Sequence, residues 1–270
     1  MANLKEIRNR IASVSSTMQI TSAMKMVSAA KLKKAQDAIT AMRPYANKLT
    51  ELLQNLSATL DADSGSKYSE HREIKNVLIV AITSNRGLCG AFNSNIIKRA
   101  TAVAESYDAN VSVVAIGKKA NDALSKNFEI ISNQSPVYDD LTFDNVAAIA
   151  EMLMEQFESK AFDKIEVIYN KFKNAATQEI MTEQFLPIEP LEGDTNANLD
   201  YIFEPSKEEI VETLIPKSLK TQLYKSIRDS FASEHGARMT AMHKATDNAT
   251  ELRDQLKLTY NKARQASITN

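Results

Sequence analysis

The C-terminal stretch MHKATDNATELRDQLKLTYNKARQA, residues 242–266, decides the fold of this chain. Its apolar and small residues recur at alternating steps of three and four, at Met242, Ala245, Ala249, Leu252, Leu256, Thr259, Ala263 and Ala266. This spacing is typical of the seam of a coiled coil, and no Gly or Pro interrupts it. Half of the seam is alanine, so a partner helix can approach closely. Because such a helix cannot bury its stripe alone, the stretch predicts a second long helix.

The N-terminal end of the chain supplies the predicted partner. A second alternation places its seam at Leu4, Ile7, Ile11, Val14, Met18, Thr21, Met24, Ser28, Lys31, Ala35, Ala38, Met42, Tyr45, Leu49, Leu52 and Leu56. The step from Thr21 to Met24 amounts to a three-residue stammer, and the polar Ser28 and Lys31 make the seam weak. Pro44 is expected to bend this helix without ending it, because packing can hold both halves.

The two helices are predicted to pair antiparallel, each roughly 80 Å long at 1.5 Å per residue. In that arrangement the weak part of the first seam, around Ser28, should lie against the alanine-rich part of the second, at Ala245 and Ala249. Pro216 is expected to break the C-terminal helix, so that its long uninterrupted part begins at Lys217.

The middle of the chain alternates strands and helices. The predicted strands are 77–83, 111–116, 128–131, 165–172 and 179–185, and the predicted helices are 96–104, a short one near Asn121, and 142–158. Repeated units of this kind favour a mostly parallel sheet covered by helices, with the last strand pair left open to an antiparallel arrangement. The fold class is therefore α/β, a long antiparallel coiled coil with an inserted Rossmann-like lobe.

This pattern divides the chain into four parts. We assign residues 1–58 to the N-terminal coiled-coil helix, 59–75 to a linker, 76–204 to the α/β lobe and 206–270 to the C-terminal coiled-coil helix. A second linker, 187–200, lies at the end of the lobe. Only 6 glycines and 6 prolines occur in 270 residues, which fits long helices and few loops.

The formal net charge of -1 hides a division along the chain. Residues 1–48 hold nine Lys and Arg against two acids, residues 217–270 hold ten against five, and residues 49–216 hold fourteen against 27. Two basic ends (+7 and +5) therefore flank an acidic centre (-13). A single cysteine, no apolar run of 18 residues and no signal peptide lead us to expect a soluble intracellular protein without a transmembrane segment.

The sequence predicts no catalytic, cofactor or metal site. The turn 85–90 (NRGLCG) follows the first strand, but its G-x-x-G spacing matches neither the dinucleotide fingerprint nor the P-loop, so we interpret its glycines as allowing a tight turn. Cys89 is interpreted as a small buried thiol, because no histidine is placed beside it to act as a base. His235 and His243 are eight residues apart, which is not the spacing of a helical zinc pair.

The basic N-terminal helix leaves three classes of function open. Lys31, Lys33 and Lys34 form a basic surface with other cations of this helix, which favours a solvated face or an acidic protein partner. The alternatives are a basic coiled-coil protein that binds nucleic acid, for which interleaved aromatic residues are lacking, and an α/β enzyme with a coiled-coil dimerisation arm.

Several motifs resemble the gamma subunit of F-type ATP synthase over the whole chain. They are Lys5–Arg8, Met24–Lys31, Arg86–Gly90, Ala237–Met242 and Asn261–Thr269. The resemblance implies a rotor shaft inside a ring of alternating alpha and beta subunits, with the lobe below on the epsilon subunit and the membrane-embedded c-ring. It implies no catalytic site in this chain, no nucleic-acid partner, and a peripheral location on the cytoplasmic face of the bacterial inner membrane.

The resemblance also implies which residues contact these partners. Those facing the alpha–beta ring would be Met24, Lys25, Lys31, Arg238, Arg264, Gln265 and Thr269. Tyr201 and Phe203 match the foot segment near the c-ring and epsilon. Proton flow would turn the c-ring and the shaft, and the shaft would drive ATP synthesis or hydrolysis on the beta subunits.

Overall fold

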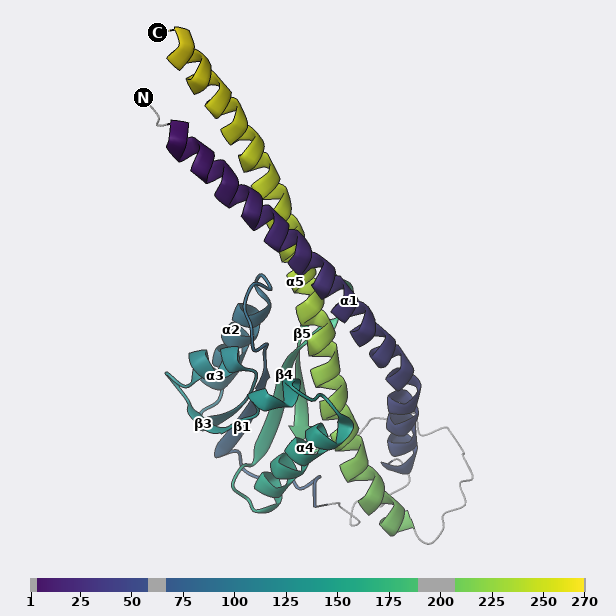
Figure 1. Cartoon of the computed structure of the whole chain (residues 1–270). Helices are drawn as coiled ribbons and strands as arrows, with labels where there is room; N and C mark the ends of the chain where they lie inside the picture. The colour runs from purple at the N-terminus through teal and green to yellow at the C-terminus, as the bar shows by residue number, and fades with distance from the viewer. Residues whose placement is uncertain (1–3, 58–66, 189–206, 270) are drawn as a thin grey trace.

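The computed structural model describes residues 4–57, 67–188 and 207–269. Two long helices, α1 (Leu4–Ser57) and α5 (Lys207–Thr269), form a shaft, and an α/β lobe packs beside the lower half of α5 (Figure 1). The lobe consists of β1 (Asn76–Ile82), α2 (Phe92–Glu105), β2 (Asn110–Ile116), α3 (Lys118–Leu124), β3 (Glu129–Asn133), the 3₁₀ turn η1 (Ser135–Tyr138), α4 (Phe143–Glu158), β4 (Lys164–Phe172) and β5 (Gln178–Leu186). The start of α1 and the end of α5 both lie at the tip of the shaft, so the helices are antiparallel, as predicted (Figure 1).

The lobe contains one five-stranded sheet in the order β3-β2-β1-β4-β5. Strands β1 to β4 are parallel, and β5 pairs antiparallel with β4 at one edge. The apolar runs predicted as strands form them, although β3 runs two residues further than the expected segment 128–131. Residues 77–82 of β1 are completely buried because helices cover both faces of the sheet.

Each face of the sheet has its own core. On one face, α2 and α3 pack on β1 and β2, where Ile79 and Ala115 are buried. On the other face, α4 and the lower part of α5 pack on the same strands, and Leu223 and Ile227 of α5 join Leu78 of β1 in one cluster. The lobe core is therefore incomplete without a helix that also belongs to the shaft.

The middle of α5 is enclosed by both parts of the molecule. None of residues 218–242 is exposed. Below, Leu223 faces the sheet. Higher up, Ala232 packs in a cluster with Leu32, Ala35 and Ile39 of α1. The sequence predicted a helix with one buried stripe, whereas every residue in this part of α5 is buried or half-buried, and small residues such as Ala232 and Gly236 lie at its close contacts.

The expected break at Pro216 is wrong, because α5 continues through this residue. A proline inside a helix costs about 3 kcal/mol or more, since it removes one hydrogen bond and its ring crowds the preceding turn. Ile215 and Leu219 on either side are buried in the lobe core. Their burial offsets this cost and keeps the helix continuous. Pro44 likewise lies inside α1.

The heptad of α1 runs on without the predicted stammer. Buried or half-buried residues recur every seven positions, at Ile7, Val14, Thr21, Ser28, Ala35, Met42 and Leu49, and at Leu4, Ile11, Met18, Lys25, Leu32, Ile39 and Ala46. Lys31 is exposed and Leu32 is buried in its place. Tyr45 is 48% exposed, and Ala46 takes its position. The period of the seam was predicted correctly, but its phase was wrong from Thr21 onward, where a step of four, to Lys25, precedes the step of three, to Ser28.

The seam of α5 shows the same one-residue difference. Met242, Ala249, Leu256 and Ala263 are buried or half-buried as predicted, but Leu252 is 40% exposed, and Thr259 and Ala266 are exposed as well. Ala245, also predicted for the seam, is half-buried. The residues beside these positions that contact α1 are polar or charged, and they are Thr246, Arg253 and Tyr260.

Three hydrogen bonds between α1 and α5 in the upper shaft explain why these polar and charged residues of α5 face α1. Thr21 and Thr246 join their hydroxyl oxygens at 2.8 Å, Arg253 Nη1 donates to Met18 Sδ at 3.4 Å, and Arg8 Nη2 donates to the Tyr260 hydroxyl at 2.7 Å. These pairs set Thr246 opposite Thr21. The expected contact of Ser28 with Ala245 and Ala249 is therefore wrong by about two helical turns.

Because α5 completes the lobe core, trimming it should unfold the lobe. We expect Leu223→Ala to lower the free energy of unfolding by about 2–5 kcal/mol, the usual cost of emptying a buried leucine site. Leu252→Ala on the same helix is the matched control and should cost about 1 kcal/mol or less. Denaturant unfolding followed by circular dichroism measures both. Equal losses would show that the lobe does not depend on α5.

Candidate functional site at the junction of shaft and lobe

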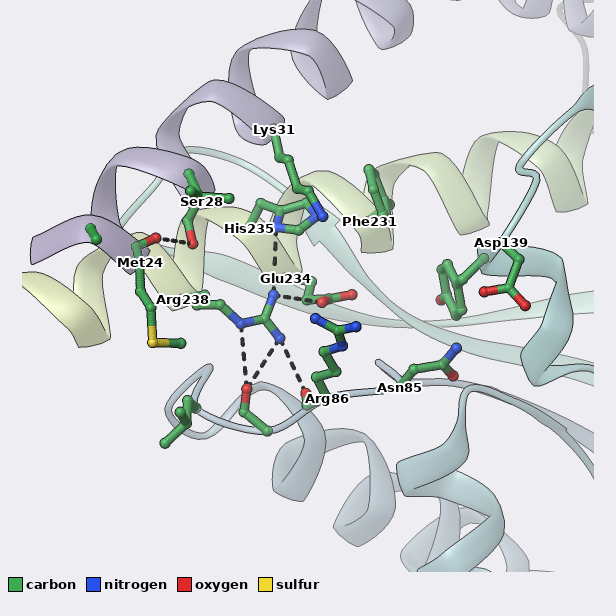
Figure 2. A pocket seen from close by; sticks show the side chains of 15 residues that line it. Met24, Ser28, Lys31, Asn85, Arg86, Asp139, Phe231, Glu234, His235 and Arg238 are labelled. Carbon is green, nitrogen blue, oxygen red and sulfur yellow. Dashed lines mark hydrogen bonds and ion pairs between the residues drawn. The ribbon is translucent and has the colours of Figure 1, made fainter. Parts of the chain in front are cut away.

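The loop after β1 lies where α/β proteins usually bind ligands. The strand order reverses at β1, between β2 and β4, and ligands of open α/β sheets bind beyond the carboxyl ends of the strands at such a point. In this structure the loop 84–91 meets α5 and α1 there (Figure 2). We call this region the junction.

The loop is held by short-range polar contacts. Asn93 Oδ1, in the first turn of α2, accepts hydrogen bonds from the backbone N–H of Ser84 at 2.9 Å and from its hydroxyl at 3.0 Å. Gly90 has a φ of 59°, so the predicted need for glycine in a tight turn is confirmed at this position. Gly87 has no left-handed backbone and open space around it, so the same explanation is wrong there. Leu88 has a φ of 62°, which is rare for a leucine.

Cys89 is a small buried thiol, as predicted. It is 1% exposed, and Asn93 Nδ2 lies 3.2 Å from its sulfur. Burial raises the pKa of the thiol. Because the thiolate is the reactive form, this environment suits a packing residue and not a nucleophile.

Arg238 of α5 closes the carboxyl end of β1. Its Nη2 donates to the carbonyl oxygens of Arg86 and Gly87, each at 3.1 Å, and its Nε donates to that of Gly87 at 3.3 Å. Its Nη1 forms an ion pair with Glu234 Oε1 at 2.6 Å, one helical turn away. The guanidinium is therefore used within the chain, and it ties the loop after β1 to the shaft.

The neighbours of Arg238 are buried titratable groups. Burial raises the pKa of Glu234, although the positive charge of Arg238 opposes this. Burial and the nearby charges of Arg238 and Lys31 lower the pKa of His235 to about 4. The His235 ring packs edge-on against Phe231, with ring centroids 4.5 Å apart. His235 is thus neutral at physiological pH.

A pocket of about 640 Å³ opens at the junction. Its walls come from α1, the loop after β1, η1 and α5. In Figure 2, Lys31 reaches down from α1 over His235, and Arg86 extends from the loop toward Glu234. We refer to this space as the junction pocket.

The remaining predicted contact residues are spread along the shaft. Met24 and Lys25 are half-buried on α1 beside the junction, and Lys31 is exposed. Arg264, Gln265 and Thr269 are exposed at the upper end of α5. Arg238, also expected to face a partner, is buried and engaged within the chain. Tyr201 and Phe203 lie outside the described residues.

Sequence reasoning missed a set of exposed apolar side chains on the shaft. They are Ile20, Met26 and Val27 on α1, and Leu258 and Ile268 on α5. Each is an apolar residue that lies off the seam, which is the signal that could have found them. Within residues 4–57, 67–188 and 207–269, no three His, Cys, Asp or Glu side chains come together as a metal site. No helix in these ranges is long and apolar enough to cross a membrane.

Known proteins of one family resemble this chain in sequence and architecture. A family model described as ATP synthase matches residues 3–270. The ATP synthase gamma chain of Flavobacterium psychrophilum is 76% identical over 272 residues, which cover 100% of this chain and 95% of the relative. The central stalk and c-ring structure of the Tetrahymena thermophila mitochondrial ATP synthase contains a chain with 27% identity and a TM-score of 0.63, with 84% of this chain and 99% of that chain covered. A rotor chain of the Euglena gracilis mitochondrial ATP synthase has the same fold, with a TM-score of 0.68, 23% identity and 98% of both chains covered.

The chain therefore belongs to the ATP synthase family. Within that family, the relative that it matches over its full length is a gamma chain, as the motifs of its two long helices predict. Neither an α/β enzyme with a dimerisation arm nor a nucleic-acid-binding rod has support from these matches.

The Arg238–Glu234 pair should be costly to break from one side. We expect Arg238→Ala to lower the free energy of unfolding by about 3–5 kcal/mol, because it leaves a buried carboxylate without its partner. Adding Glu234→Gln should recover part of this loss, since it removes the unpaired charge. Arg264→Ala, an exposed arginine on the same helix, should change stability by less than about 0.5 kcal/mol. Denaturant titration of wild type and these three variants tests the pair. A double variant no more stable than Arg238→Ala would contradict a buried, uncompensated carboxylate.

His235 should make the folded chain less stable in acid. Its pKa is about 4 in the folded chain and about 6.5 when unfolded. Between these values only the unfolded chain binds the proton, so stability falls as the pH drops from about 6.5 to about 4. His235→Gln should lose this part of the pH dependence, whereas His71→Gln, at an exposed position, should retain it. Unfolding free energies across this pH range provide the measurement. Parallel curves for wild type and His235→Gln would show that His235 is not buried in its neutral form.

Proposed function

We propose that this chain is the central rotor shaft of an F-type ATP synthase. It couples rotation of the proton-driven c-ring to ATP synthesis or hydrolysis on the beta subunits, and it carries no catalytic site of its own. The observation that supports this function best is α5, a single helix that is at once half of the shaft and part of the lobe core. Torque applied to the lobe therefore reaches the tip of the shaft through continuous helix and not through a linker.

The part of the shaft from the junction to the tip is the surface that we assign to the alpha–beta ring. Its contact residues are Met24, Lys25, Lys31, Arg264, Gln265 and Thr269, together with the exposed apolar residues Ile20, Met26, Val27, Leu258 and Ile268. Large apolar side chains that stay exposed along a two-helix shaft are accounted for if a ring encloses it. For Arg238 the internal bonds to Glu234 and the loop carbonyls support a bracing role, so we leave it out of this surface.

The lower end of the molecule is assigned to the epsilon subunit and the c-ring. Tyr201 and Phe203 would belong to this foot. The location that follows is peripheral, on the cytoplasmic face of the bacterial inner membrane. The related Tetrahymena and Euglena structures, a central stalk with c-ring and a rotor, support this arrangement.

Reconstitution tests the function directly. The purified chain mixed with alpha and beta subunits of the same organism should form a stoichiometric complex that hydrolyses ATP, whereas the chain alone should not. The triple variant Lys31→Glu, Lys33→Glu and Lys34→Glu should fold normally, because exposed charges each change stability by less than about 0.5 kcal/mol. It should join the ring more slowly at low salt, since the basic face no longer attracts an acidic partner.

The two arms of this experiment answer different questions. Failure of the wild-type chain to assemble with alpha and beta would overturn the rotor function. Normal assembly of the triple variant at all salt concentrations would leave the rotor function intact and exclude an electrostatic role for this basic face.

A further inference from the structure

The junction pocket combines cationic and apolar side chains, and two of its residues, Lys31 and Val27, also belong to the surface that we assign to the alpha–beta ring. Its exposed cations are Lys31 of α1 and Arg86 of the loop after β1, and neither side chain forms a hydrogen bond or an ion pair with another described residue. The same two elements supply its apolar wall, with Val27 of α1 57% exposed and Leu88 of the loop 63% exposed. Leu88 is held toward solvent by a backbone conformation that is rare for its residue type.

The charges of the pocket do not cancel within the chain. Arg238 and Glu234 form an ion pair and neutralise each other. Asp139 is the other acid in the lining, and it is exposed at the edge of the pocket. Lys31 and Arg86 therefore leave one positive charge in excess, and both lie close enough to Glu234 to lower its pKa.

His235 adds a polar group without a partner. It is 4% exposed, and its Nδ1 lies 3.5 Å from Arg238 Nη1, which is always a donor. The imidazole proton then resides on Nε2, which is buried and has no hydrogen-bond partner. A buried N–H of this kind costs free energy until it meets an acceptor. A ligand that draws Lys31 away from the His235 ring would supply one.

We propose that the junction pocket binds a small organic anion, a carboxylate or sulfonate attached to a short apolar chain. The anionic group would lie between Lys31 and Arg86 on the His235 side, and the apolar chain would lie against Val27 and Leu88. The volume of about 640 Å³ is within the range of small-molecule sites. An inorganic anion would leave the apolar wall unused, and an organic cation would meet the excess positive charge.

Binding there would affect the link between shaft and lobe. The ligand would contact α1 through Lys31 and Val27, and the loop after β1 through Arg86 and Leu88, so it would bridge two elements that Arg238 already joins through α5. A ligand that binds only the folded chain raises its stability by mass action. The pocket is therefore a place where a small molecule can stiffen the junction.

Calorimetric titration of the full chain with octanoate tests the site. We expect saturable binding at one site, with no binding of octylammonium and much weaker binding of inorganic phosphate. The double variant Lys31→Gln and Arg86→Gln should weaken octanoate binding about tenfold, since it removes two charge-assisted contacts. The double variant Lys33→Gln and Lys34→Gln removes the same number of charges from α1 next to Lys31, outside the pocket, and should bind octanoate like wild type.

Three further results decide between this site and its rivals. Val27→Ser should weaken octanoate binding and leave phosphate binding unchanged, as expected if the chain lies on the apolar wall. Equal affinity for phosphate and octanoate would overturn the proposal in favour of a simple oxyanion site. The proposal would also be overturned if the Lys31–Arg86 and Lys33–Lys34 double variants lost octanoate affinity equally. It would likewise be overturned if the wild-type chain did not bind octanoate at all. Circular dichroism of each variant verifies that it is folded.

Discussion

The middle of α5, where every residue from 218 to 242 is buried or half-buried, is the constraint on which the rest of the structure depends. A helix that packs on a sheet with one face and on another helix with the opposite face has no room for large side chains everywhere. Ala232 and Gly236 provide the space: a side chain at Gly236 would meet the Ala175 backbone at 3.2–3.3 Å, in the β4–β5 turn. Because α5 packs on both the sheet and α1, moving it away from either one would expose buried side chains. Shaft and lobe therefore behave as one body.

The chemistry of the shaft changes along its length for the same reason. Near the lobe its seam is apolar and closely packed, with Leu32 and Ile39 against α5. Toward the tip no other described segment covers the two helices, and polar pairs such as Thr21 with Thr246 replace apolar contacts in the seam. A polar pair in a seam gives up some stability but favours one register. The upper shaft thus keeps its alignment with little apolar burial, and its outer apolar residues remain free for a partner.

The spacing of buried residues in each element could be predicted from the sequence. Which residues of the two long helices face each other could not. Apolar runs such as that of β1 mark buried strands directly, because helices must cover both faces. In the shaft, by contrast, the choice of apolar residues for the seam led to Leu252, although Arg253 faces α1. A hydrogen bond to the partner helix outweighs hydrophobicity at a position where neither side chain becomes fully buried. The helix through Pro216 was unpredictable for a related reason, since its support comes from lobe residues distant in sequence.

The candidate site was the least predictable part, because it exists only where distant segments meet. In the sequence, Glu234 and Arg238 are an ordinary pair one helical turn apart, and residues 85–90 are a glycine-containing turn without a phosphate-binding motif. The fold brings them together at the strand-order reversal, where other α/β proteins leave room for a nucleotide. Here the guanidinium of Arg238 takes up the loop carbonyls of Arg86 and Gly87, and a buried carboxylate holds it in place. The position that serves as a ligand site in related folds has become the joint between lobe and shaft, and the junction pocket is the part of it that the joint leaves open.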